Sequence, residues 1–178
     1  MSKQGKYAVR ISGLGEGDHD YSFELGKKFF DSFAESEVKD GNVQAQVVLE
    51  KKHGVMVLHF TLQGDVEVIC DRCLEPFRLN IGASQNIFIK TGDNHEEIED
   101  DVVMIGRDEH EIEVGQYLYE FIILALPFQR IHPADDGHSL CNPDMLEKLE
   151  AHRTKEKDQK DVTDPRWDVL KRIIEKNK

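Results

Sequence analysis

The stretch that decides the fold reads VQAQVVLEKK (43–52) and VMVLHFTLQG (55–64), with Lys-His-Gly at the join (52–54). Apolar and polar residues alternate along both halves, which is the period of a strand with one buried face. A short join that contains glycine, placed between two such runs, predicts an antiparallel hairpin. We therefore expect the chain to be built on an antiparallel sheet.

Further strands and two helices are predicted around this hairpin. Phe29, Phe30 and Phe33 have helical spacing and predict a short amphipathic helix over 26–36. The apolar residues of VGQYLYEFIILALP (114–127) predict a longer, largely buried helix that stops before its proline. The other expected strands are 7–11, 21–25, 65–70, 77–90, 102–106 and 111–114.

The end of the chain differs in composition from the rest. Residues 148–178 are rich in charge, and Asp164 followed by Pro165 suits a helix start. An apolar stripe follows this start, made of Trp167, Leu170, Ile173 and Ile174. The expected fold class is α+β: a hairpin-rich antiparallel sheet with one long helix and a helical C-terminal arm. The expected domains are a core over 1–147 and an arm over 148–178.

Charge is distributed unevenly along the 178 residues, whose net charge is −12. Residues 93–113 hold ten acidic residues against one basic residue, whereas 148–178 carry ten basic residues against seven acidic ones. Because nonspecific binding to phosphate is driven by clustered cations, the acidic body argues against a general electrostatic RNA clamp. It leaves room for a local basic face, or for binding to a basic protein.

Several protein classes are disfavoured by the sequence. Its apolar runs are far shorter than the roughly 20 residues that span a bilayer, and the N-terminus lacks the apolar stretch of a secretory signal. We therefore expect a cytoplasmic protein without a membrane partner. The chain contains no phosphate-binding glycine loop and no nucleophile elbow, so we expect neither an enzyme nor a small-molecule substrate.

The motif that stands out is VICDRCLEPF (68–77), in which Cys70 and Cys73 lie between two predicted strands. Such a turn points both thiolates to one side, as in zinc knuckles. Cys141, with either His132 or His138, would complete a closed site of three sulfurs and one nitrogen, which suits structural zinc. Free thiols without metal remain an alternative. A thioredoxin-like redox pair is disfavoured because a strand, not a helix, follows the motif.

Three segments together resemble the family of YceD-like large ribosomal RNA subunit accumulation proteins. They are VEVICDRCLEPF (66–77), LYEFIILALPFQRIHP (118–133) with Cys141 downstream, and DPRWDVLKRI (164–173). The resemblance implies a ribosome-biogenesis role in accumulation or processing of large-subunit (23S) ribosomal RNA, without an established catalytic activity. It also favours His132 over His138, because His132 stands where many members carry a cysteine.

The implied partner is pre-ribosomal RNA or a ribosome-assembly protein. A rival hypothesis is an acidic adaptor that uses 93–113 to bind a basic ribosomal protein, and a thiol oxidoreductase is a weaker one. The candidate RNA- or partner-binding residues are the cations near the cysteine motif and along the arm: Arg72, Arg78, Arg153, Lys155, Lys157, Lys160, Arg166, Lys171 and Arg172.

Overall fold

The computed structural model describes residues 6–92, 96–99, 101–135 and 138–153. The chain divides into two compact units, Met1–Asn142 and Pro143–Lys178. The first unit holds a six-stranded sheet and two helices, and the described part of the second unit holds one helix.

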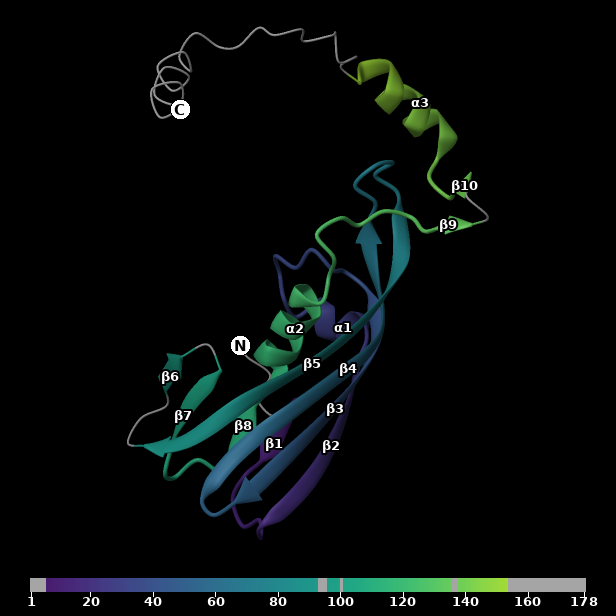
Figure 1. Cartoon of the computed structure of the whole chain (residues 1–178). Helices are drawn as coiled ribbons and strands as arrows, with labels where there is room; N and C mark the ends of the chain where they lie inside the picture. The colour runs from purple at the N-terminus through teal and green to yellow at the C-terminus, as the bar shows by residue number, and fades with distance from the viewer. Residues whose placement is uncertain (1–5, 93–95, 100, 136–137, 154–178) are drawn as a thin grey trace, which may run out of the picture. The chain divides into compact units, whose positions relative to one another are not determined.

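The main sheet has the strand order β2-β3-β4-β5-β7-β6 (Figure 1). Neighbouring strands run antiparallel, except that β5 and β7 are parallel. Its strands are β2 (Gly17–Leu25), β3 (Gly41–Lys52), β4 (Val55–Ile69), β5 (Pro76–Gly92), β6 (Glu96–Glu99) and β7 (Val102–Gly106). The hairpin expected from the alternating sequence is therefore the centre of the sheet.

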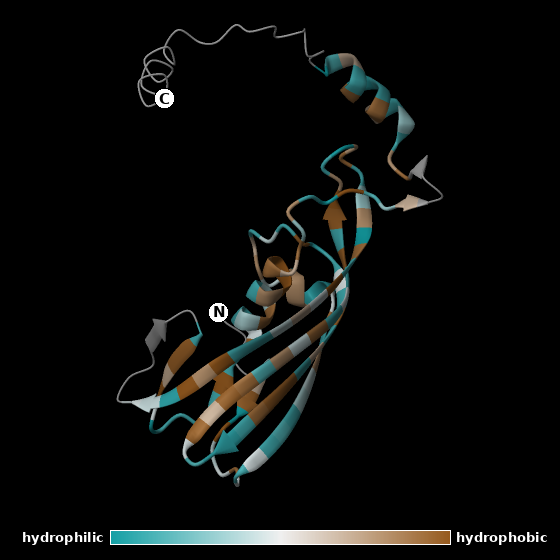
Figure 2. Ribbon diagram, in the orientation of Figure 1, coloured by the Kyte–Doolittle hydropathy of each residue, from teal (hydrophilic) through white to brown (hydrophobic). Residues whose placement is uncertain are grey.

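The β3–β4 hairpin is closed by a two-residue turn. His53 and Gly54 both have positive φ angles, 50° and 81°, and Lys52 pairs with Val55. A turn with two positive φ angles matches the right-handed twist of the strands that it joins. Hydrophobic and hydrophilic residues alternate along both strands (Figure 2). The apolar face is buried and the polar face meets solvent.

Strand β4 continues without interruption to Ile69, although its second half was expected to be a separate strand. Gly64 makes this continuity possible, because a Cβ atom there would lie 2.2 Å from the backbone oxygen of Asn42. The glycine lets β3 approach closely, so Gln-Gly-Asp (63–65) is part of the strand and not a turn. This extension carries the chain from the sheet to the cysteine motif.

The buried face of the sheet is covered by α1 (Lys27–Phe30), α2 (Gly115–Leu124) and a two-stranded ribbon (Figure 1). The ribbon pairs β1 (Ala8–Arg10) with β8 (Glu111–Glu113). Phe60 of β4 is fully buried and meets the ring of Phe121 edge-on at 5.1 Å. The core thus lies between the sheet and these covering elements.

The prediction of one long helix and a helical C-terminal arm is wrong. The sheet dominates, and the three described helices have four, ten and ten residues. Helix α2 ends at Leu124 because Leu126, the residue before Pro127, is disfavoured in the helical conformation. Helix α3 (Pro143–His152) begins before the expected boundary at 148, and 154–178 lie outside the described residues.

Short strands also lie in segments for which no strand was predicted. Strand β6 lies within the acidic segment 91–101, and β9 (Ala134–Asp135) pairs with β10 (His138–Ser139) between α2 and Cys141. Across the described residues, none of the helices has the length and apolar character needed to cross a membrane.

Candidate metal centre

The structure brings together Cys70, Cys73, His132 and Cys141. Cys70 directly follows β4, Cys73 lies in the turn before β5, His132 follows α2, and Cys141 follows β10. Their ligand atoms all lie within 4.8 Å of one another. The three sulfurs are buried and the imidazole is half-buried.

The turn at the end of β4 orients the first two thiols. The backbone N–H of Cys70 donates to the Glu75 carbonyl at 2.9 Å, and the N–H of Leu74 donates to the Cys70 carbonyl at 2.9 Å. Leu74 takes a left-handed backbone conformation with φ of 60°, which lets the chain reverse within this turn. Both sulfurs therefore lie on the inner side of a short knuckle.

The distances within the cluster fit a tetrahedral ion. The Sγ atoms of Cys70 and Cys141 are 3.7 Å apart, and His132 Nδ1 lies 3.4 Å from Cys73 Sγ and 3.7 Å from Cys141 Sγ. Around a tetrahedral zinc, two sulfurs lie about 3.8 Å apart, and a sulfur and an imidazole nitrogen about 3.6 Å apart. The same distances suit weak hydrogen bonds among free thiols. Four ligands would fill a tetrahedral site and leave no open position.

The electrostatics at Cys70 favour a thiolate, the form that binds metal. Burial is the largest influence and raises the pKa of this thiol. Hydrogen bonds from the backbone N–H groups of Cys73, Arg72 and His132, together with one from the His132 ring, lower the pKa from an ordinary 9.0 to about 6. The Arg72 N–H lies 3.5 Å from the sulfur.

The segment after α2 is attached to the knuckle by its backbone. The N–H of Asp71 donates to the Arg130 carbonyl at 2.7 Å, and the N–H of Arg130 donates to the Asp71 carboxylate at 2.7 Å. The ring of Phe77 packs against the His132 imidazole at a centroid distance of 4.6 Å. These contacts position His132 independently of any ion.

Sequence reasoning missed Asp71, Arg130 and Phe77 as positioning residues. No sequence signal pairs Asp71 with Arg130, because the two are 59 positions apart and Arg130 takes part through its backbone N–H and carbonyl. Phe77 is the last residue of the cysteine motif and directly follows Pro76, and an aromatic residue one place into a strand is ordinary core patterning.

The alternative ligand and the candidate cations have different surroundings. His138 belongs to β10 and its side chain lies outside those described. Arg72 is exposed beside the cluster, whereas Arg78 pairs with Asp40 and Asp65 at 3.0 Å each. Arg153 is exposed just after α3. The other candidates lie outside the described residues: Lys155, Lys157, Lys160, Arg166, Lys171 and Arg172.

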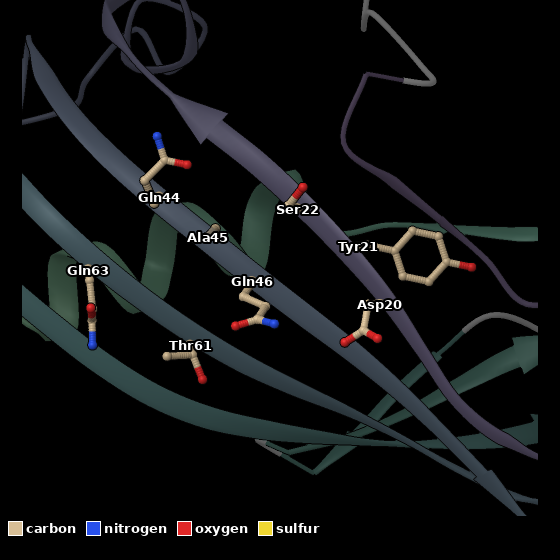
Figure 3. Close-up of a pocket in the computed structure, with 8 residues that line it drawn as sticks. All are labelled: Asp20, Tyr21, Ser22, Gln44, Ala45, Gln46, Thr61 and Gln63. Carbon is tan, nitrogen blue, oxygen red and sulfur yellow. The ribbon is translucent and has the colours of Figure 1, made fainter.

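The solvent face of the sheet holds a second polar region, far along β3 and β4 from the knuckle. A shallow hollow there is lined mainly by uncharged side chains (Figure 3). Its lining includes Asp20, Ser22, Gln44, Gln46, Thr61 and Gln63. These are the outward residues of alternating strands, which is the ordinary composition of a solvated sheet face.

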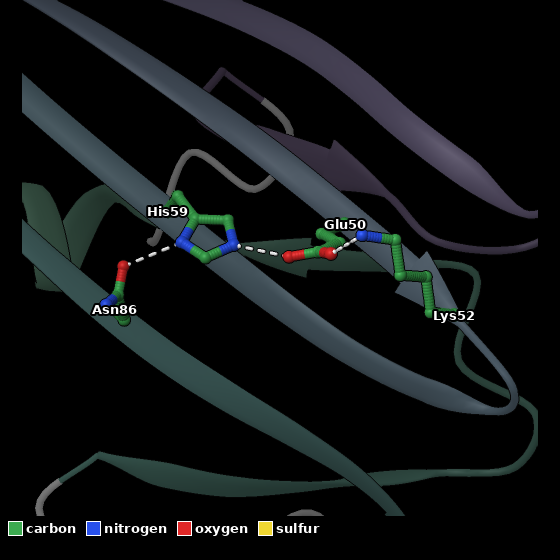
Figure 4. A network of polar contacts seen from close by, with 4 residues as sticks. All are labelled: Glu50, Lys52, His59 and Asn86. Carbon is green, nitrogen blue, oxygen red and sulfur yellow. Dashed lines mark hydrogen bonds and ion pairs between the residues drawn. The ribbon is translucent and has the colours of Figure 1, made fainter.

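A charged network lies on the same face (Figure 4). His59 Nε2 is 2.9 Å from Glu50 Oε2, and His59 Nδ1 is 2.8 Å from Asn86 Oδ1. The hydrogen bond with Glu50 is the main cause that raises the pKa of His59. Hydrogen bonds from Lys52 and then His59 lower the pKa of Glu50. The network is a cross-strand support of the sheet.

Comparison with known proteins gives one family. The sequence profile described as "Large ribosomal RNA subunit accumulation protein YceD" matches residues 58–173. No curated protein and no solved structure gives a significant match. The matched region begins within β4 and includes all four residues of the cluster.

Proposed function

We propose that this chain, which belongs to the YceD family of large ribosomal RNA subunit accumulation proteins, is a non-enzymatic assembly factor that binds large-subunit precursor RNA. The family assigns a role in accumulation of that RNA, and the family match is the observation that carries the proposal. The site of action is the cytoplasm, where the precursor is transcribed and assembled.

The chemistry of the cysteine cluster supports a structural role over a catalytic one. Cys70, Cys73 and Cys141 are at most 5% exposed, so a disulfide substrate has poor access to the sulfurs. A thiol oxidoreductase needs an accessible nucleophilic sulfur. Three thiolates and one imidazole are also the ligand set of closed structural zinc sites.

The proposed cofactor is therefore one structural zinc ion held by Cys70, Cys73, His132 and Cys141. When bound, the ion joins the tip of the β4–β5 hairpin to the segment after α2. Metal analysis of the purified chain beside a Cys70→Ser/Cys73→Ser variant tests this: we expect one zinc per chain, lost in the variant. Metal-free wild-type protein, purified without chelators, would refute the zinc proposal and leave a hydrogen-bonded thiol cluster.

The acidic segment 93–113 supports a second candidate, an adaptor for a basic ribosomal protein. Glu111 and Glu113 are exposed on β8, and Asp101 and Asp108 are exposed on either side of β7. Affinity purification with and without ribonuclease separates the two candidates. We expect large-subunit RNA to be recovered and lost after nuclease treatment. Recovery of one basic protein that survives nuclease and requires 93–113 would favour the adaptor.

Deletion of the gene tests the proposed role at the level of the cell. We expect large-subunit RNA to fall relative to small-subunit RNA, with precursor species enriched, and wild-type protein to restore the ratio. An unchanged ratio in the deletion strain would contradict the role itself, whichever molecule the protein binds.

A further inference from the structure

Exposed apolar side chains are concentrated beside the cysteine cluster. Leu74 is 65% exposed next to Cys73, and Phe128 is 100% exposed in the segment that leads to His132. A fully exposed phenylalanine loses the burial that normally stabilises an aromatic side chain. The knuckle therefore presents apolar surface that its own fold does not use.

The backbone conformation of Leu74 is also unfavourable for a leucine. Its φ of 60° lies in the left-handed region, where a residue with a Cβ atom is less stable than glycine. The knuckle requires this backbone conformation, since the N–H of Leu74 closes the turn onto the Cys70 carbonyl. Glycine would satisfy the turn, so the leucine side chain is not explained by folding. Strain and apolar exposure at one residue indicate a role in binding.

A cation stands directly beside this leucine. Arg72 is exposed, and among the residues that the structure describes its guanidinium forms no ion pair or hydrogen bond. The carboxylates next to it accept hydrogen bonds, Asp71 from the Arg130 N–H and Glu75 from the Asn142 side chain. Arg72 is thus the cation of the knuckle that is available to an anionic partner.

Phe128 is held near Arg72 by hydrogen bonds. Asp71 directly precedes Arg72, and Phe128 lies two residues before Arg130. The paired 2.7 Å hydrogen bonds between Asp71 and Arg130 therefore fix the backbone that carries the phenylalanine beside the backbone that carries the arginine. The segment that carries Arg72 and Leu74 and the segment that carries Phe128 therefore lie next to each other at the knuckle.

We propose that Arg72, Leu74 and Phe128 form a single-stranded RNA-binding surface, named here the knuckle surface. A nucleobase stacks on the Phe128 ring, Leu74 contacts an adjacent base or sugar, and Arg72 binds the backbone phosphate. Aromatic stacking combined with a cation is the usual way in which proteins hold unpaired RNA. The surface rests on the proposed function, since it assigns RNA binding to defined residues.

Charge favours the knuckle over the acidic segment 93–113 as a site for RNA. The knuckle segment 69–78 contains two basic and two acidic residues, so it is neutral, whereas 93–113 has a net charge of −9. Arg78, a candidate RNA-binding residue from the sequence, is less available to a phosphate because it forms ion pairs with Asp40 and Asp65. RNA therefore meets less electrostatic repulsion at the knuckle segment than at 93–113.

Binding of the zinc-loaded full chain to a fluorescein-labelled unpaired oligonucleotide of about 12 nucleotides tests the surface. Phe128→Ala should weaken binding about tenfold or more, and Leu74→Gly about fivefold. Arg72→Gln should reduce the slope of log affinity against log salt by about 0.7. A duplex of the same sequence should bind more weakly.

Leu74→Gly separates binding from folding. Because glycine suits the left-handed position, this variant should keep its zinc and unfold at the same or a higher denaturant concentration. Phe88→Ala and Lys90→Gln serve as matched controls, since Phe88 is 41% exposed and Lys90 is exposed on β5, away from the knuckle. Both control variants should bind RNA as the wild type does.

The outcomes distinguish this surface from the function on which it rests. Wild-type binding that survives Phe128→Ala, Leu74→Gly and Arg72→Gln would overturn the knuckle surface and leave RNA binding elsewhere on the chain. Equal losses in the Phe88 and Lys90 controls would also overturn it. A wild-type chain that binds no RNA would refute direct RNA binding itself, and the knuckle surface with it.

Discussion

We expect His132→Asn to weaken zinc binding and His138→Asn to leave it unchanged. Among the described side chains, the ring nitrogen of His132 lies 3.4 Å from Cys73 Sγ and 3.7 Å from Cys141 Sγ. A structural zinc site contributes about 10–16 kcal/mol of binding free energy, so removing one of four ligands costs about 3 kcal/mol. That loss corresponds to about a hundredfold weaker Kd. His138→Asn should bind zinc as tightly as the wild type.

Competition with a chromophoric chelator measures both dissociation constants, and metal analysis gives the stoichiometry. Circular dichroism before the titration shows that each variant is folded. The knuckle and the Asp71–Arg130 hydrogen bonds do not depend on the imidazole, so the His132 variant should keep the sheet. Loss of zinc in His138→Asn together with wild-type affinity in His132→Asn would show that His132 is not the fourth ligand.

Three further predictions concern the sheet. Gly64→Ala should lower the free energy of unfolding by about 3 kcal/mol in urea titrations, because the added Cβ meets the Asn42 backbone oxygen at 2.2 Å; wild-type stability would contradict that contact. Phe60→Ala, at a fully buried position, should cost about 3–5 kcal/mol, and a loss below 1 kcal/mol would mean that the core is not packed there. Protonated His59 stabilises the fold through its contact with Glu50, and this raises the pKa of His59 above the ordinary value of 6.5. The stabilisation is complete at pH values below 6.5 and is lost as the pH rises through the raised pKa. Urea midpoints of His59→Gln should therefore change less than those of the wild type between pH 6 and pH 9, and parallel profiles would show that the Glu50 contact is not formed.

The strands were predictable where one face is buried. Alternation in 43–64 fixed the hairpin and its short turn, since a shift of one residue would expose the whole apolar set. The break expected after Gly64 was wrong because its reason is tertiary: the glycine accommodates the Asn42 backbone on the neighbouring strand. A glycine inside a strand and a glycine in a turn look the same in sequence.

The helices were less predictable than the strands. Phe29, Phe30 and Phe33 have helical spacing, yet α1 spans only Lys27–Phe30, and Phe33 beyond it stacks on Tyr119 at 4.0 Å. Gly26 gives this helix no side-chain cap, so packing of the rings decides its length. Helix propensity and periodicity depend on residues within one segment, whereas the position of the Phe33 ring depends on Tyr119, which is far along the chain.

The candidate site was predictable as a residue set and not as a geometry. The spacing of Cys70 and Cys73 between two strands indicated a knuckle, and Cys141 was the remaining cysteine. What positions His132 in the structure is the pair of hydrogen bonds between Asp71 and Arg130, one of which is accepted by the Asp71 carboxylate, and this pairing has no sequence signature. The exposure of Phe128 and the left-handed conformation of Leu74 were likewise visible only in three dimensions.

Direct contact between this chain and large-subunit RNA is what the proposed function requires. Ultraviolet crosslinking of the tagged full chain in growing cells, followed by sequencing of the attached RNA, measures that contact. We expect crosslinks to be concentrated in unpaired segments of large-subunit precursor RNA and to be reduced in a Phe128→Ala strain. Crosslinks no more frequent than those of an unrelated tagged protein, in cells where deletion lowers large-subunit RNA, would contradict it.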